Sequence, residues 1–536
     1  MKMGISSETK AILNYKVLTF SAFVSVTMSF FISDQFIYFS CLSEQGIDYW
    51  SVDKNNSITG LHDAQKKAAF IQSVKNFLGI GTGLFSTLVV GYLSDKYGRQ
   101  LTLGIIVFGE ALRILAISIV VFFNLSPWSL IVSELLEGSI GGGLLSISAQ
   151  IAACLADLTQ NSQNNNIVSN ENMDMGTRTK RLVKERWLLF TLLDGVISCG
   201  MALANALAGY MIQHYRFYIT MLTCIIFLIP LPISLLLTSE KSMKIIQVAE
   251  PDVENSSDEL CDATSVIQNK SGELQEFPNS SYSVHVKSGN SCMNKLRMVS
   301  NLPRTHLIIV TLVFMFSISG ISDAQYLFLY LMSNPFLWNA QAVGLFIGVR
   351  DVCCTFMSVF CVSMVVKFRK NQPDKHIKVT RSDAATSNRI NTTLFSRFKS
   401  VDQILLIVLV FFGFLLLSVH QILMGMASTL TIPSANIFIY FATIPRFVKG
   451  FQVPILRTMI SKWTEVSKQG MIMSVVGVVE RLGILISIAA LPVIYGSTIS
   501  SFKGSVFLVC ASFTIMEALI VLFLPVYAPK LSSSQS

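Results

Sequence analysis

About twelve apolar segments, each long enough to cross a lipid bilayer, dominate this sequence. Each holds roughly 18–28 mostly apolar residues, and an α-helix needs about 20 to span a hydrocarbon core of about 30 Å. With 52% hydrophobic and only 14% charged residues, the chain has too little polar surface for a water-soluble protein. The sequence therefore predicts a polytopic helical membrane protein, with spans near residues 17–41, 68–92, 101–123, 128–153, 186–208, 217–237, 305–332, 341–366, 402–424, 433–455, 470–495 and 504–527.

Lysine and arginine are distributed unevenly about these spans. With the N-terminus placed in the cytosol, about 30 of the 41 Lys and Arg residues fall in cytosolic segments. The outer loops contain only Lys54, Lys66, Lys67, Arg216 and Lys503. This bias predicts that both termini are cytosolic. Because the basic charge follows the membrane, we expect no nucleic-acid partner.

The spans form two groups of six around a polar segment. We expect a cytosolic linker at 238–304, which is polar, has little apolar periodicity and should be disordered. This layout is typical of transporters built from two parallel repeats. The predicted organisation is a cytosolic N-terminus (1–16), a six-helix bundle (17–237), the linker (238–304), a second six-helix bundle (305–527) and a cytosolic tail (528–536).

The stretch GYLSDKYGRQ (91–100) joins spans 2 and 3. Gly91 would let the end of span 2 approach its neighbour closely, and Gly98 would support a tight turn. Asp95 would meet the positive N-terminal end of span 11, with Arg99 holding the carboxylate in place. The stretch resembles the G-x-L-x-D-[RK]-x-G-[RK] loop of the major facilitator superfamily. We interpret it as a latch that closes the cytosolic side; the alternative is a turn that only sets topology.

Ionisable side chains inside the spans are costly in lipid, so each is a candidate for function. Depth along the helices predicts a network of Arg113, Glu110 and Glu137, beside the stretch GSIGGG (138–143) that permits close helix contact. This network can either couple protons or only neutralise charge. The full set of candidates is Asp34, Lys75, Glu110, Arg113, Glu134, Glu137, Asp194, Asp323, Arg350, Asp351, Arg446, Lys449, Glu480 and Arg481.

Two pairs of these charges are adjacent in the sequence. Arg350 precedes Asp351, and Glu480 precedes Arg481. Neighbouring side chains on a helix point in different directions, so we expect each of the four to have another partner.

Four further stretches point to one family of transporters. They are AACLADLTQ (152–160), RWLLFTLLDGVIS (186–198), YLMSNPFLW (330–338) and PILRTMISKWTEVSKQGMIMSVVGVVERLG (454–483). Together they resemble solute carrier family 46, which includes the proton-coupled folate transporter, a lysosomal member and a thymic stromal member. The resemblance extends through most of the membrane portion and is most specific at 454–483.

The resemblance implies roles for particular residues. Asp157 and Asp194 take the places of carboxylates tied to transport and proton coupling in the folate branch, and Arg457 matches an arginine linked to substrate and proton binding. Gly320 stands where the folate transporter has a histidine, and Leu337 where it has a cysteine. The segment VVERLG is more similar to the lysosomal and thymic branches, so folate itself is a doubtful substrate.

These observations predict an all-α membrane protein with the major facilitator fold, twelve helices in two six-helix bundles. We expect proton-coupled symport of an organic, anionic solute toward the cytosol by alternating access. The candidate proton-coupling residues are Asp194, Asp157, Glu480 and Glu137, and the candidate substrate-binding residues are Arg457, Arg113 and Arg350. The family suggests folate-like compounds, muropeptides or cyclic dinucleotides as substrates.

Two alternatives remain open. The chain can be a uniporter or exchanger without proton coupling, or a transporter-like receptor or scaffold that acts through its long loops. No nucleophile–base pair or metal-ligand spacing appears, so we expect no enzyme, no cofactor and no metal site. We expect a monomer in the plasma membrane or the lysosomal membrane, with glycosylation at Asn55 in the outer loop 42–66.

Overall fold

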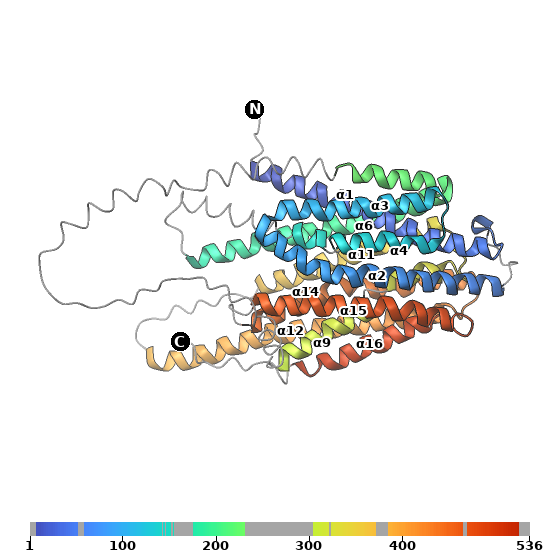
Figure 1. Ribbon diagram of the computed structural model, residues 1–536. Helices are drawn as coiled ribbons and strands as arrows, with labels where there is room; N and C mark the ends of the chain where they lie inside the picture. The colour runs from blue at the N-terminus through green and yellow to red at the C-terminus, as the bar shows by residue number, and fades with distance from the viewer. Residues whose placement is uncertain are drawn as a thin grey trace, which may run out of the picture. The chain divides into compact units, whose positions relative to one another are not determined.

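α-Helices and short 3₁₀ segments make up the regular structure of this protein (Figure 1). The computed structural model has no strand within the residues that it describes. The predicted linker lies outside these residues except for Arg304, which begins a helix. The described residues are 7–51, 58–141, 143–144, 146–151, 154, 175–230, 304–320, 323–370, 384–464 and 469–524.

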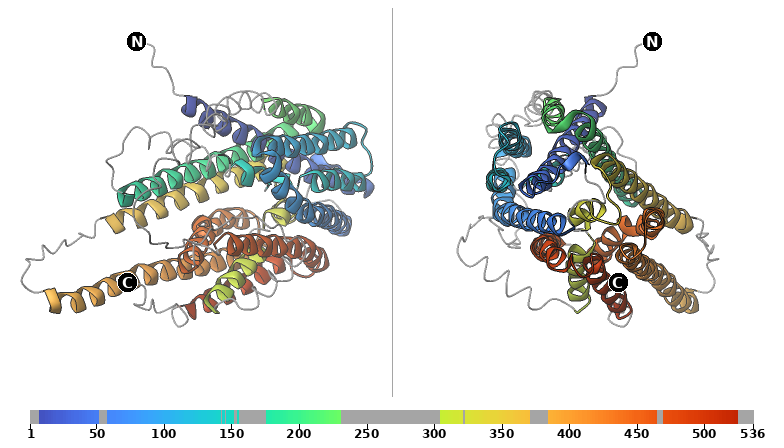
Figure 2. Two further views of the ribbon diagram at one scale, coloured as in Figure 1. Left: turned by 60° about the vertical axis from the view of Figure 1, so that its left-hand side comes forward. Right: turned by 90° about the vertical axis from the view of Figure 1, so that its right-hand side faces the viewer.

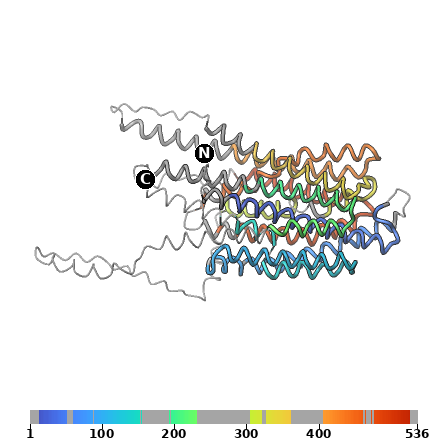
Figure 3. The backbone as a smooth tube through the Cα atoms, turned by 90° about the horizontal axis from the view of Figure 1, so that it is seen from above, coloured from blue at the N-terminus to red at the C-terminus, as the bar shows by residue number. Residues whose placement is uncertain are grey.

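The long described helices lie side by side (Figures 1, 2 and 3). They fall into an N-terminal and a C-terminal set, which correspond to the two groups of predicted spans. The N-terminal half contains α1 (Ser7–Glu44), η1 (Tyr49–Ser51), α2 (Ile58–Tyr97), α3 (Arg99–Phe122), η2 (Pro127–Ser129), α4 (Leu130–Ile140) and α6 (Met175–Leu228). The C-terminal half contains α9 (Arg304–Ser319), α10 (Asp323–Leu331), α11 (Ala340–Lys370), α12 (Ala384–Ala427), α13 (Ser434–Thr443), η4 (Ile444–Phe451), α14 (Gln452–Trp463), α15 (Gln469–Thr498) and α16 (Ser505–Val521).

Seven of the described helical segments are long and apolar enough to cross a membrane on their own. The predicted spans also fall on shorter helices, because several spans are interrupted. Spans 5 and 6 both lie on α6, where Arg216 has a φ of 67° and breaks the helical path. Span 10 contains the 3₁₀ segment η4 between α13 and α14, with Pro445 in its first turn.

Span 7 is broken between α9 and α10, and other helices supply hydrogen bonds at the break. In lipid the last carbonyls of a helix need partners within the protein. The Ser487 hydroxyl of α15 donates to the Ile318 carbonyl (2.9 Å), and the Gln421 amide of α12 donates to the Ser319 carbonyl (2.9 Å). These two side chains make an interrupted helix tolerable at membrane depth.

Helix α15 contains Pro492, which cannot donate a backbone hydrogen bond to the carbonyl of Ile488. The hydroxyl of Ser73, on α2 of the opposite half, lies 3.1 Å from that carbonyl oxygen and 2.9 Å from the carbonyl oxygen of Ala489. A side chain of the N-terminal half therefore satisfies a helix defect in the C-terminal half.

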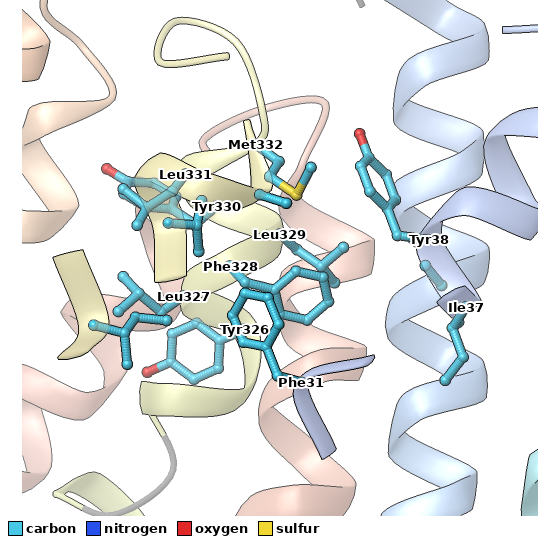
Figure 4. Packing of buried hydrophobic residues seen from close by; sticks show 14 of the residues in the cluster. Phe31, Ile37, Tyr38, Tyr326, Leu327, Phe328, Leu329, Tyr330, Leu331 and Met332 are labelled. Carbon is cyan, nitrogen blue, oxygen red and sulfur yellow. The ribbon is translucent and has the colours of Figure 1, made fainter. Parts of the chain in front are cut away.

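The last six residues of the short helix α10 are buried. Every residue from Tyr326 to Leu331 is at most 4% exposed, and Figure 4 shows these side chains beside Phe31 of α1. The Tyr330 hydroxyl donates to the Met424 carbonyl of α12 at 2.5 Å, so its polar end is also satisfied. The stretch 326–331 is apolar on every face and belongs in a core, and it contributes to a large buried cluster.

Helices α6 and α11 cross at glycines, one from each half. A Cβ atom added to Gly344 would lie 3.0 Å from the Cα atom of Gly209 and closer still to the carbonyl oxygen of Asn205. Small residues permit this close approach of two backbones in a membrane.

Gly344→Ala should therefore destabilise the protein by about 1–3 kcal/mol, because the added methyl group must push α11 away from α6. Gly104→Ala is the matched control, since a Cβ atom at Gly104 on α3 would meet no atom within 4 Å. Thermal unfolding of both purified variants in detergent measures the difference. Equal melting temperatures would contradict the proposed tight crossing.

Candidate functional site

The guanidinium of Arg113 on α3 is fully buried. Its Nε lies 3.1 Å from Oε2 of Glu110 and 2.8 Å from Oε2 of Glu137, and its Nη1 lies 3.4 Å from Oε1 of Glu134. The predicted contacts of Arg113 with Glu110 and Glu137 are present. Glu134, one turn before Glu137 on α4, is a further member that the depth argument did not include.

Arg113 also contacts α1. Its Nη2 donates to the Ser29 hydroxyl at 2.6 Å, and the guanidinium lies 4.0 Å from the centre of the Phe30 ring. One side chain thus joins α1, α3 and α4. Glycines of the stretch 138–143 permit close packing here: a Cβ atom at Gly141 would lie 3.0 Å from the Cα atom of Ile106 on α3, and one at Gly138 would overlap the Thr82 side chain of α2.

A second buried cation, Lys75 on α2, lies beside Asp34 on α1. The Lys75 Nζ is 2.9 Å from Oδ1 of Asp34, 2.9 Å from the Ser33 hydroxyl and 3.8 Å from Oε1 of Glu134. Both residues were among the predicted intramembrane charges, but their pairing was not predicted. Counting residues from the outer ends of predicted spans 1 and 2 places Asp34 and Lys75 at the same height in the membrane, so the pairing could have been predicted.

Glu134 connects the two cations, because its Oε1 contacts both Lys75 and Arg113. We call the connected group the acidic network. Ionised throughout, its four carboxylates exceed its two cations and leave a net negative charge in a buried region, which is costly. Its members are Asp34, Lys75, Glu110, Arg113, Glu134 and Glu137.

A cavity of ≈ 330 Å³ lies between the two halves, with part of the acidic network in its wall. Residues from α1, α2, α4, α6, α10, α11 and α15 line it. Its apolar wall includes Phe30, Phe31, Phe328, Ile347 and Ile484, and its charged lining residues are Asp34, Glu134, Glu137, Asp351 and Arg481. This size and this mixture of apolar and polar groups are typical of a small-molecule site.

The three arginines predicted to bind substrate lie elsewhere in the described structure. Arg113 is enclosed by the acidic network and does not line the cavity. Arg350 is buried and its Nη2 lies 3.1 Å from Oδ1 of Asp351. The expectation that these neighbours need separate partners was wrong here, since the long arginine side chain bends back onto the next residue.

The other adjacent pair behaves as predicted. Glu480 forms an ion pair with Arg457, whose side chain is 48% exposed. Arg481 points to the other half, and its Nη1 donates to the Thr87 hydroxyl of α2. Arg481 lines the cavity and was not among the predicted substrate-binding residues. Its charge within a predicted span marked Arg481 as a functional candidate. The sequence did not indicate that this face of α15 lines the cavity, because that depends on how the helices pack.

The predicted latch coincides with the end of α2 and the start of α3. Gly98 connects these helices with a φ of 94°, the left-handed conformation that a tight turn here requires. A Cβ atom at Gly91 would meet no described atom within 4 Å, so the described residues do not show the close approach expected there. Helix α15 is described from Gln469 onward. The Asp95 side chain lies outside the described structure, so its contact with α15 and the role of Arg99 stay predictions.

Three other predicted residues also lie wholly or partly outside what the structure describes. Asp157 and Asn55 are outside the described ranges. Asp194 is on helix α6, but its side chain is not described. Their roles stay predictions.

No protein-family model matches the chain. The "Lysosomal proton-coupled steroid conjugate and bile acid symporter SLC46A3" of Rattus norvegicus is 22% identical over 459 residues, which cover 85% of this chain and 80% of that relative. The protein of the same name from Homo sapiens is 20% identical over 511 residues, covering 93% and 91%. The resemblance to solute carrier family 46 is confirmed.

Solved structures agree on the fold. The inward-open xylose transporter XylE from E. coli has a TM-score of 0.56 and 14% identity, covering 98% of both chains. The nucleoside transporter NupG has a TM-score of 0.54 and 10% identity, covering 96% of this chain and 98% of that one. The chain is a multi-pass membrane protein with the major facilitator fold, and the proteins it resembles are transporters rather than enzymes.

Arg113→Gln should destabilise the protein strongly, by about 3–5 kcal/mol, because it leaves buried carboxylates without their cation. The double variant Arg113→Gln/Glu137→Gln should recover part of this loss, since one of those carboxylates is removed as well. Lys67→Gln is the control: its ion pair with Glu44 is about 40% exposed, so its loss should cost at most about 1 kcal/mol. Thermal unfolding of the three variants in detergent tests the order, and an Arg113→Gln variant as stable as Lys67→Gln would contradict it.

Proposed function

We propose that this chain is a proton-coupled symporter that moves an amphipathic organic anion toward the cytosol. The observation that carries the proposal is the cavity between the halves, whose wall includes Asp34, Glu134 and Glu137 of the acidic network. In a fold that works by rocking of two halves, a site between them is exposed to each side of the membrane in turn. Groups in its wall can then gain protons on one side and lose them on the other.

The charge balance of the acidic network suits proton coupling. Fully ionised, the network is negative, and burial away from water disfavours that state. Protons bound from an acidic compartment bring the network closer to neutral and reduce the cost of closing the cavity around it. Opening to a neutral cytosol hydrates the carboxylates and allows the protons to leave.

The shape and lining of the cavity favour a substrate with a large apolar body. Three phenylalanines, Phe30, Phe31 and Phe328, contribute to the wall. The curated relatives are named as symporters of steroid conjugates and bile acids. Bile acids and acidic steroid conjugates combine an apolar ring system with one anionic group, and we propose this class ahead of the folate-like compounds, muropeptides and cyclic dinucleotides that the family also suggests.

We place the protein in the lysosomal membrane, as the relatives' name indicates for them. The acidic lumen would then supply the protons, and the basic cytosolic segments would fix the orientation with both termini in the cytosol. Substrate and protons would leave together into the neutral cytosol.

A proton-independent uniporter or exchanger is the second candidate, and one observation favours it. Arg113 and Lys75 each contact more than one carboxylate, as they would if the acids served only to neutralise them. The pH dependence of uptake separates the two functions.

Glu137→Gln should flatten the pH dependence of uptake. The wild-type carboxyl must bind a proton for the cycle, so wild-type uptake of radiolabelled cholate should rise as external pH falls from 7.5 to about 5.5. Glutamine resembles the protonated form at every pH, so the variant should keep exchange and lose concentrative, pH-dependent uptake. Cells that display the protein at the surface allow the measurement.

Asp194→Asn is tested in parallel, because that residue is the other leading proton-coupling candidate. Glu44→Gln, an exposed change outside the cavity, is the control and should keep the wild-type pH profile. Wild-type uptake that is saturable but independent of pH would support the uniporter or exchanger instead. A normal pH profile in Glu137→Gln with a flat one in Asp194→Asn would move proton binding from α4 to α6.

A further inference from the structure

Arg481 is the one cation that lines the cavity among the residues described. The other charged lining residues are the carboxylates Asp34, Glu134, Glu137 and Asp351. An anionic substrate in this cavity therefore meets a single guanidinium against several acids. Helix α15 places it about twelve residues, or roughly 18 Å, from the helix start, which is close to the middle of the span.

The guanidinium of Arg481 differs in its partner from four ion-paired cations of the membrane helices. Lys75, Arg113, Arg350 and Arg457 each lie within ion-pair distance of a carboxylate. Arg481 has no such contact in the described part of the chain, and its hydrogen bond goes to the neutral hydroxyl of Thr87. The carboxylate beside it in sequence, Glu480, is already paired with Arg457.

The bond from Arg481 to Thr87 is one that an anion can replace. The Thr87 hydroxyl donates its own proton to the Gly83 carbonyl at 2.7 Å and accepts from Arg481 through a lone pair. Loss of the Arg481 contact therefore leaves the hydroxyl proton satisfied. A carboxylate or sulfate carries the opposite charge to the guanidinium and often accepts through two parallel bonds, whereas the hydroxyl is neutral and accepts one.

We propose that Arg481 binds the anionic group of the substrate and leaves Thr87 when it does so. The apolar body of the substrate then lies against the phenylalanines of the wall. Because Arg481 belongs to α15 and Thr87 to α2, substrate binding also removes a hydrogen bond that joins the two halves. This inference rests on the proposed function and names the residue that selects an anion.

The test compares Arg481→Gln, Arg481→Lys and Thr87→Val in cells that display the full chain, with uptake normalised to surface protein. The probe is radiolabelled cholate, and the neutral alcohol made by reducing its carboxylate serves as a competitor. Arg481→Gln should raise the KM for cholate by at least about tenfold, and Arg481→Lys should recover part of the loss because it keeps the charge. The neutral alcohol should inhibit wild type and Arg481→Gln at similar concentrations.

The variant Thr87→Val distinguishes two roles of Arg481: binding of the substrate anion, and a structural hydrogen bond between the halves. It removes the competing acceptor and leaves Arg481 in place, so it should lower the KM for cholate by about twofold or more. Lys67→Gln is the control and should have the wild-type KM.

An unchanged KM in Arg481→Gln would overturn the inference while the proposed function stands. So would an equal loss of affinity in Arg481→Gln and Thr87→Val, because the bond would then be structural. Absence of cholate uptake by the wild-type protein, with surface display confirmed, would overturn the proposed function and this inference with it.

Discussion

Burial of a single guanidinium, that of Arg113, sets the arrangement of the N-terminal half. A charge at membrane depth must find partners within the protein, and Arg113 finds them on α1, α3 and α4 at once. Most of those partners are carboxylates. The acids that neutralise Arg113 therefore leave an excess of negative charge. Lys75 offsets part of that excess through Glu134 and Asp34. What remains is a buried group with more carboxylates than cations, of which Asp34, Glu134 and Glu137 line the cavity.

The two halves contribute different chemistry to that cavity. The N-terminal half supplies most of the carboxylates, while α15 of the C-terminal half supplies Arg481. A substrate that reaches both must lie between them, and motion of one half against the other changes the surroundings of both at the same time. In the proposed symport, coupling between proton and anion would need no direct contact between their binding groups, since each would respond to the same movement.

The spans were predictable from sequence because lipid permits few alternatives to a helix of about 20 apolar residues. The contacts of Arg113 with Glu110 and Glu137 were predictable because depth along a helix fixes height in the membrane. Direction around the helix axis is a different matter. It decides that Arg350 turns to Asp351 and that Arg481 reaches Thr87, and it depends on packing that one sequence does not encode locally. The break in span 7 was equally hidden, because its support comes from Ser487 and Gln421 on distant helices.

The hydrogen bond from Ser73 to the carbonyl of Ile488, which Pro492 leaves without a helix donor, affects how water enters the interface between the halves. Separation of α2 from α15 near Ser73 would leave the carbonyl of Ile488 without its donor, since Pro492 cannot supply one. Exposed carbonyls at that depth need water molecules in place of the lost hydroxyl. Opening of this part of the interface is thus a hydration step as well as a movement. Its rate should depend on the activity of water, so a solute too large to enter the cavity would slow the cycle by osmotic stress alone.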